Sequence, residues 1–234
     1  MNGWVAKRFW KTSEVIEKSE GFTVCLDGRV LKTPAKSHLI LPSREMAHAI
    51  AAEWDRQEGD IDPNTMPVTK SANAAIDKVA TQHFEIAEML TEYGNTDLLC
   101  YRAVAPEELI ARQAESWDPI LDWAAENLGA RLLSVSGVMY EEQDKTAISR
   151  LRAQVHAMDN YALAAFYDLV SLSGSLVIAF AARAEIRTIS ELWELSRVDE
   201  SWQEEQWGVD DEASKQIALK FQAFENANRF LKMT

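Results

Sequence analysis

The chain has 234 residues, of which 47% are hydrophobic and 26% are charged. This length and composition are typical of one large or two modest soluble globular domains. With 24 lysines and arginines against 37 aspartates and glutamates, the formal net charge is -13, which excludes a general attraction to nucleic acid or to an anionic membrane surface. A basic or amphipathic partner surface fits this charge better.

The cysteines and the N-terminus indicate where the chain works. Cys25 and Cys100 form neither a CxxC pair nor a Cys/His ligand spacing, so we expect reduced, packed thiols, no metal site and no cofactor. The stretch MNGWVAKRFWKTSEV lacks the features of a secretion signal or a transit peptide. The longest apolar run, Leu176–Ala182, is too short to cross a bilayer. We expect no stable membrane insertion and a cytoplasmic or organellar location.

The first part of the chain predicts a small antiparallel sheet. In GFTVCLDGRVLKTP, two β-rich runs flank Asp27 and Gly28, a pair that favours a type I′ hairpin because both central residues need positive φ. Trp4–Trp10 and His38–Leu41 are further strand candidates. The sheet ends at Pro42.

A first helix is predicted directly after the sheet. Ser43 is a suitable N-cap, and Met46, Ile50 and Trp54 recur at a helical spacing. We therefore expect this helix to continue to about Gln57.

The remainder of the chain is predicted to be helical. Ile76, Val79, Phe84 and Leu90 mark one face of a long helix, and Gly94 is the expected left-handed stop.

Later helices are predicted from prolines and glycines. Pro106 suits the first turn of one helix, and Asp118 with Pro119 suits a restart, as cap and first residue. Leu132–Val138 is predicted to be extended. A helical stripe then follows at residues 147, 151, 155 and 158, and further helices cover 160–184 with a break at Ser173-Gly174.

The predicted fold class is therefore α+β. We expect a small N-terminal domain, residues 1–65, with an antiparallel sheet and a helix, followed by a larger all-α domain, residues 66–234. The chain contains no internal repeat.

The stretch YGNTDLLCYRA, residues 93–103, sets Cys100 among ionisable side chains. A neighbouring base or cation lowers a thiol pKa and creates a nucleophile, but none of the four histidines lies close to Cys100 in sequence. The same residues suit a helix end that runs into a short buried segment capped by Asp97. We favour this structural interpretation.

The segment DESWQEEQWGVDDEA, residues 199–213, carries seven acids and no lysine or arginine. Such a density of carboxylates opposes burial, so most of them must face water or a basic partner. Trp202 and Trp207 interrupt the acids. They are either core anchors or the aromatic part of a docking surface. Gly208 is the expected stop, and Asp210 the cap of a last helix.

Motif order adds a resemblance to a known family. The chain resembles the assembly chaperone of the F-type ATP synthase catalytic head, the factor that binds its free alpha subunit. The motifs that carry this resemblance, in order, are FTVCLDGRVLKTPA, IAAEWDRQ, MPVTKSANAAID, YGNTDLLCYRA with a following proline, QAESWDPILDW and WQEEQWGVDDEA. They extend from about residue 8 to the C-terminus.

The resemblance implies a non-enzymatic function and a two-domain layout. It implies that the protein shields the apolar surface that a free alpha subunit will later present to a beta subunit. In the Gln-x-Glu-x-Trp-Gly motif it implies Glu205 as the main partner-binding residue, together with Gln203, Trp207 and Asp210. We expect a monomer in the bacterial cytoplasm, with the mitochondrial matrix as the family's other location.

Other residues are assigned to folding. We expect Trp54 to anchor its helix, Asp97 to cap a turn, and Arg102 to pair with a buried carboxylate, while Asp27 and Gly28 form the hairpin.

Two alternatives remain open at this point. One is an enzyme of unfamiliar type, such as a hydrolase that uses carboxylates near Glu205 or the Cys100 thiol, and it predicts a pocket lined by groups with shifted pKa values. The other is a general binding module for a different basic or apolar partner.

Overall fold

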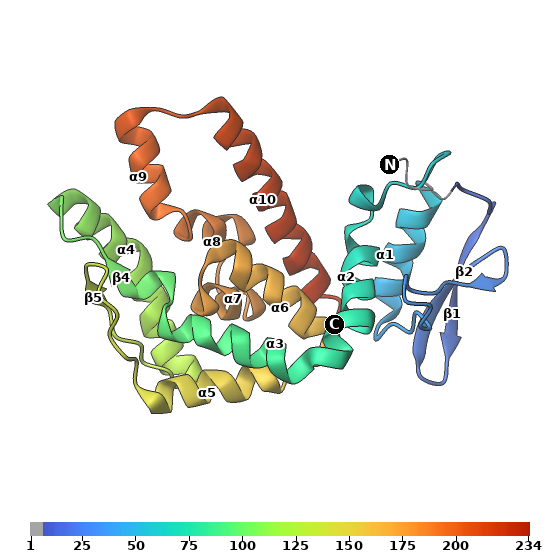
Figure 1. The fold of residues 1–234 in the computed structure, drawn as a ribbon, viewed down its shortest axis with the longest axis horizontal. Coiled ribbons are helices and arrows are strands. Elements are labelled where there is room, and N and C mark those ends of the chain that lie inside the picture. The colour runs from blue at the N-terminus through green and yellow to red at the C-terminus, as the bar shows by residue number, and fades with distance from the viewer. Residues whose placement is uncertain (1–6) are drawn as a thin grey trace. The chain divides into compact units, whose positions relative to one another are not determined.

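A computed structural model describes residues 7–234 and confirms the α+β class: a three-stranded antiparallel sheet precedes a mostly helical remainder (Figure 1). The strands and helices are β1 (Ser13–Lys18), β2 (Gly21–Leu26), β3 (Arg29–Val30), α1 (Arg44–Asp55), α2 (Pro67–Ala74), α3 (Ala80–Glu92), β4 (Tyr101–Arg102), α4 (Glu107–Trp123), β5 (Val135–Ser136), α5 (Lys145–His156), α6 (Asn160–Ser173), α7 (Leu176–Arg183), α8 (Ile189–Leu195), α9 (Val198–Trp207) and α10 (Asp211–Leu231).

Packing divides the chain into two compact units. The first contains the residues up to Gln82 together with Asp159–Ala165 and Arg229–Thr234, and the second contains His83–Met158 and Phe166–Asn228. Consequently α3, α6 and α10 each contribute residues to both units. The expected domain boundary after residue 65 stays a prediction.

The sheet of the first unit is built around β2. β1 and β3 pair with it in antiparallel register on either side. Asp27 (φ 46°) and Gly28 (φ 78°) make the connection between β2 and β3, which confirms the predicted hairpin. The Asp27 carboxylate accepts hydrogen bonds from the backbone N–H groups of Thr12 and Lys11, and these bonds hold the pKa of Asp27 below its ordinary value.

The two other strand predictions are wrong within the described residues. Trp4–Trp10 lies partly outside them, and its described part makes only a single bridge, between Lys7 and Asp60. His38–Leu41 pairs through isolated bridges at its two ends. The remaining strand of the sheet is instead β1, beside β2. The sequence pattern missed β1 because none of its residues is fully buried.

Helix α1 confirms the predicted first helix. The Ser43 hydroxyl accepts a hydrogen bond from the Met46 N–H at 3.2 Å, and Met46 and Ile50 are fully buried. Trp54 is half-buried near the end of α1 and packs on Trp10, with ring centroids 5.1 Å apart. Local capping and the spacing of apolar residues therefore predicted this helix correctly.

Segments from later in the sequence complete the first unit. The Ser43 hydroxyl also donates to the carbonyl of Met233, and the Tyr161 hydroxyl donates to the carbonyl of Ile40. The rings of Tyr161 and Phe230 lie 6.5 Å apart. The core of this unit is therefore assembled from three separate stretches of chain.

A buried carboxylate joins α1 to α2. Glu53 accepts hydrogen bonds from the N–H groups of Val68 (2.7 Å) and Thr69 (2.8 Å) and from the Thr69 hydroxyl (2.7 Å). The residue before α2, Met66, makes no side-chain cap. Glu53 thus satisfies backbone donors that the first turn of α2 leaves without an intrahelical partner.

The second unit is built around α7, in which Leu176–Ala182 is entirely buried. Gly94 lies against this helix: a Cβ added to Gly94 would be 3.1 Å from Ile148 Cδ1 and 3.3 Å from Leu176 Cδ2. The expectation of a left-handed Gly94 is wrong, because its φ is not positive and it lies in a 3₁₀ turn. Close packing explains the glycine.

Two helix predictions in the second unit are wrong for physical reasons. Phe84 is 64% exposed. The non-helical Gln82 (φ -133°) interrupts the helical register between Val79 and Phe84, and the buried residues of α3 are Ala87, Leu90 and Thr91. Asp118 and Pro119 do not restart a helix, since α4 runs through Pro119.

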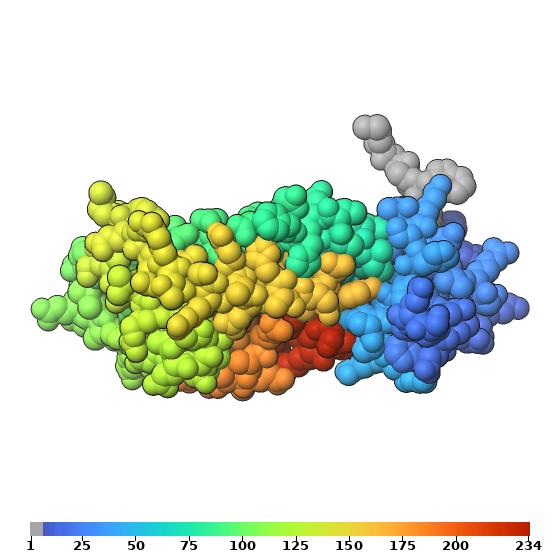
Figure 2. Space-filling view, turned by 90° about the horizontal axis from the view of Figure 1, so that it is seen from below, coloured from blue at the N-terminus to red at the C-terminus, as the bar shows by residue number. Residues whose placement is uncertain are grey.

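The predicted helices between residues 145 and 184 are confirmed. Gly174 (φ 70°) separates α6 from α7. The predicted stripe on α5 is buried at Leu151 and Val155. α5 and α3 lie side by side at the surface (Figure 2). Glu88 of α3 forms an ion pair with Arg152 (3.2 Å) and lies 2.6 Å from Nε2 of His156, both on α5.

Replacing Glu53 by glutamine tests the buried cap of α2. The variant places an amide donor against N–H donors, so we expect the free energy of unfolding to fall by about 1 to 3 kcal/mol in urea denaturation. Asp55→Asn makes the same chemical change at an exposed position of α1 and should have little effect. Equal stability of the two variants would contradict this role.

Candidate partner-binding site

Helix α9 and the beginning of α10 border an open groove of about 460 Å3. Gly208 (φ 89°) ends α9, and the Asp210 carboxylate accepts hydrogen bonds from the N–H groups of Glu212 and Ala213, both at 2.8 Å. These contacts confirm the predicted stop and cap (Figure 1). The lining residues are Arg197, Glu200, Gln203, Glu204, Trp207, Gly208, Asp210, Ala213, Gln216, Ile217 and Lys220.

The two faces of α9 have different surroundings. Gln203 and Trp207 are four residues apart, so they lie on the same face, and both line the groove together with Asp210. Glu205 does not line the groove and instead contacts α4 through Arg112. The structure therefore brings together three of the four predicted partner-binding residues and separates Glu205 from them.

Glu205 forms a bidentate ion pair with Arg112. Arg112 Nη1 donates to Glu205 Oε1 at 2.7 Å, and Arg112 Nη2 donates to Oε2 at 2.8 Å. The guanidinium of Arg112 also lies 4.9 Å from the ring centre of Trp202. The hydrogen bond from Arg112 lowers the pKa of Glu205, and the same bond raises the pKa of Arg112. Glu205 is therefore an ionised carboxylate with both oxygens engaged.

The charge of the groove is only partly compensated. Glu204 pairs with Arg197 at 2.8 Å, whereas Glu200 and Asp210 form no ion pair with any residue in the described part of the chain. Lys220 is the other cation of the lining. An excess of negative charge at a concave surface favours a cationic or amphipathic partner.

Trp207 is 79% exposed at this groove, and the neighbouring Val209 is 64% exposed. The interpretation of Trp207 as a core anchor is therefore wrong. Trp202, by contrast, is half-buried beneath the Arg112 guanidinium. A large exposed aromatic side chain beside a charged groove is a feature of protein-binding surfaces.

Asp97 lies at the buried start of α7. Its carboxylate accepts hydrogen bonds from the Ser175 hydroxyl (2.7 Å) and from the N–H groups of Val177 and Leu99, both at 3.1 Å. Burial raises the pKa of Asp97 to about 6, although these hydrogen bonds act in the opposite direction. Asp97 therefore caps a 3₁₀ turn and also serves the N-terminus of α7.

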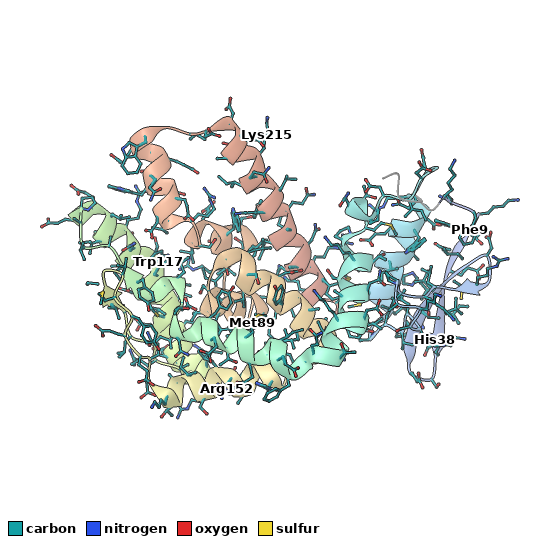
Figure 3. The ribbon with its side chains drawn as sticks, in the orientation of Figure 1. Phe9, His38, Met89, Trp117, Arg152 and Lys215 are labelled. Atoms are coloured by element: carbon teal, nitrogen blue, oxygen red, sulfur yellow. The ribbon has the colours of Figure 1, made fainter. Side chains whose placement is uncertain are left out.

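Arg102 connects the same turn to α4. Its Nε donates to the Leu99 carbonyl at 2.9 Å, and its Nη2 donates to Asp118 at 2.7 Å. The guanidinium lies 5.2 Å from the ring centre of Trp117, a buried residue on α4 (Figure 3). The Asp118 side chain is 55% exposed, so the expectation of a buried carboxylate partner is not met.

Cys100 is fully buried in the same turn. Burial, aided by the nearby charge of Asp97, raises the pKa of the Cys100 thiol far above its ordinary value. A protonated and inaccessible thiol is a poor nucleophile. The geometry thus supports a structural role for this turn.

Two further properties of residues 7–234 concern metal binding and membrane insertion. Within this range, no group of histidine, cysteine, aspartate and glutamate side chains is placed to hold a metal ion. Over the same residues, no helix combines the length and the apolar character needed to cross a membrane.

Sequence reasoning missed Arg112 and Gln113. Gln113 is buried, accepts a hydrogen bond from the Ala103 N–H at 2.8 Å and donates to Asp199 at 2.6 Å. Arg112 and Glu205 are 93 residues apart in sequence. Such contacts have no local signature, since they depend on how α4 and α9 pack. Only the excess of acids on α9 indicated that a cation was needed nearby.

The comparisons with known proteins agree on one kind of protein. The model of the ATP12 chaperone protein family matches residues 7–125. The crystal structure of Atp12 from Paracoccus denitrificans is 45% identical, with a TM-score of 0.95 and 98% of both chains covered. An aspartate-to-lysine mutant of P. denitrificans Atp12p has the same identity and TM-score over 97% of both chains. Protein atp12, mitochondrial, of Schizosaccharomyces pombe is 25% identical over an alignment of 219 positions that covers 88% of this chain and 75% of the relative.

The raised pKa of Asp97 predicts a dependence of stability on pH. The folded state keeps the proton up to about pH 6, whereas the unfolded chain releases it near 3.8. The contribution of Asp97 to stability is therefore complete below the lower value and is lost as the pH rises through the upper one. Relative to Asp97→Asn, the wild type should lose at most about 1.4 kcal/mol per pH unit across this window in urea denaturation. A flat difference would contradict the raised pKa.

The burial of Cys100 predicts slow thiol chemistry. In a Cys25→Ser background, an aromatic disulfide reagent should label Cys100 only as fast as the protein unfolds, because the thiol is protonated and inaccessible. Release of the aromatic thiolate measures this rate, and denaturant provides the fully reactive control. Rapid stoichiometric labelling of the folded protein would restore the nucleophile hypothesis.

Proposed function

This chain belongs to the ATP12 chaperone protein family, and from that premise we propose that it binds the free alpha subunit of the F-type ATP synthase catalytic head. The family is one of ATP synthase assembly chaperones, so the partner is a subunit of that enzyme. We propose further that binding shields the surface of the alpha subunit that later faces a beta subunit. A subunit interface without its partner is a large apolar patch that is prone to aggregation.

The exposed Trp207 at the edge of an acidic groove is the observation that carries this proposal. Gln203, Trp207 and Asp210 line the groove, and we propose that they contact the alpha subunit directly. Trp207 supplies apolar contact area, while the uncompensated acids select a partner segment with basic residues. Glu205 belongs to the proposed site as well, on the opposite face of α9.

The structure offers little support for the hydrolase alternative. A general acid needs a pKa near the working pH, whereas Arg112 lowers the pKa of Glu205. The Cys100 thiol is buried and its pKa is raised. Glu205 and the Cys100 thiol, which that alternative names, are therefore unsuited to acid or nucleophilic catalysis in this arrangement.

We also propose that the protein acts as a monomer in the compartment where the catalytic head is assembled. For a bacterial chain this compartment is the cytoplasm. The name of the S. pombe relative gives a mitochondrial location for that protein.

The proposal is tested by diluting denatured alpha subunit into buffer with increasing amounts of this protein and recording light scattering. We expect scattering to be suppressed near a one-to-one ratio. Trp207→Ala should weaken binding roughly thirtyfold, as expected for the loss of an aromatic contact worth about 2 kcal/mol. Phe84→Ala removes a similarly exposed aromatic side chain outside the groove and should suppress scattering like the wild type.

Each outcome has a distinct meaning. Absence of suppression by folded wild type, checked by circular dichroism, would contradict the chaperone proposal. Suppression by the wild type and by Trp207→Ala alike would keep the chaperone but remove the groove as its binding site.

A further inference from the structure

Helix α9 takes its position from α4. Two side chains of α4 contact α9 in the described structure: Gln113 Nε2 donates to Asp199 at 2.6 Å, and Arg112 pairs with Glu205. A third, Trp117, donates through Nε1 to the carbonyl of Leu195 at 2.8 Å, at the end of α8 and just before α9. Among the described elements, α9 packs mainly on α4. The wall of the groove that α9 provides is therefore set by α4.

Arg112 makes the outermost of these contacts. Trp117 and Gln113 are buried, whereas the side chains of Arg112 and Glu205 are 37% and 51% exposed. Beyond Glu205, α9 continues only to Trp207 before it ends at Gly208. Within residues 7–234, the ion pair is thus the last side-chain contact of α9 with α4 before the exposed tryptophan.

The geometry of the contact between Arg112 and Glu205 fixes the orientation of both side chains. A guanidinium that makes two parallel hydrogen bonds to one carboxylate defines the orientation of both groups, and stacking on Trp202 removes a further degree of freedom. Ion pairs as exposed as this one add little to global stability. Its effect is therefore expected on the local placement of α9 rather than on the folding of the unit.

We propose that Arg112 is a positioning residue for partner binding, and that Glu205 acts through Arg112 rather than by touching the partner. This inference rests on the function proposed above. Both Glu205 oxygens are already bonded to Arg112, and Glu205 lies on the face of α9 away from the groove. A lysine or arginine at position 205 would face the Arg112 cation, and their repulsion would move the end of α9 that carries Trp207.

A charge-exchange experiment tests this inference with four proteins: wild type, Arg112→Glu, Glu205→Arg and the double variant that carries both changes. The first readout is the dissociation constant for the alpha subunit. The second is amide hydrogen exchange of peptides that cover residues 201–208, which needs no partner. We expect each single variant to bind about tenfold more weakly and to exchange faster, and the double variant to recover both properties.

Arg152→Glu is the matched control. It reverses an arginine in another exposed ion pair of the same unit, on α5, and should alter neither readout. Chemical denaturation of all variants should give midpoints close to that of the wild type, which separates positioning from general destabilisation.

Three results would overturn the inference. Normal binding by Arg112→Glu would show that the ion pair is incidental and would alone remove the positioning role. A double variant as weak as Glu205→Arg would mean that the partner requires a carboxylate at position 205. Unchanged exchange over residues 201–208 in both single variants would exclude a movement of α9, and this readout decides the inference even if the wild type fails to bind the alpha subunit.

Discussion

A helix that begins inside a protein leaves backbone N–H groups out of reach of water, and the second unit is organised around one such helix. Ser175 and Asp97 together satisfy the buried start of α7. The turn that delivers Asp97 also carries Leu99, whose carbonyl accepts a hydrogen bond from Arg102. Arg102 in turn reaches α4 through Asp118. The requirement to satisfy one helix end thus determines the position of a second helix.

From α4 outward, the contacts become progressively more accessible to water. Trp117 and Gln113 are buried, Arg112 is partly exposed, and Trp207 is largely exposed. Local stability falls in the same direction, because exposed contacts are weaker than buried ones. A binding surface at the outer end of such a series combines a fixed base with an edge that adapts to its partner.

The sequence predicted those features that depend on neighbouring residues. The Asp27-Gly28 hairpin, the Ser43 cap and the Gly208 stop each follow from local backbone chemistry, whereas Gln203, Trp207 and Asp210, which line the groove, were expected from the family resemblance. Gly94, Pro119 and Arg112 could not be interpreted in this way. Gly94 is required by close packing against the side chains of Ile148 and Leu176. Pro119 lies inside α4, where the two residues before it make tertiary contacts. Arg112 pairs with a residue 93 positions away in sequence.

The route of the chain through the two units bears on how the protein folds during synthesis. The first unit begins with the N-terminal sheet, but it also includes Asp159–Ala165 and Arg229–Thr234. The hydrogen bonds of Ser43 with Met233 and of Ile40 with Tyr161 can therefore form only after these later residues have been synthesised. Although N-terminal domains usually fold first on the ribosome, this unit completes its core only after the second unit has been translated. The N-terminal sheet is thus synthesised well before the segments that complete the core of its unit.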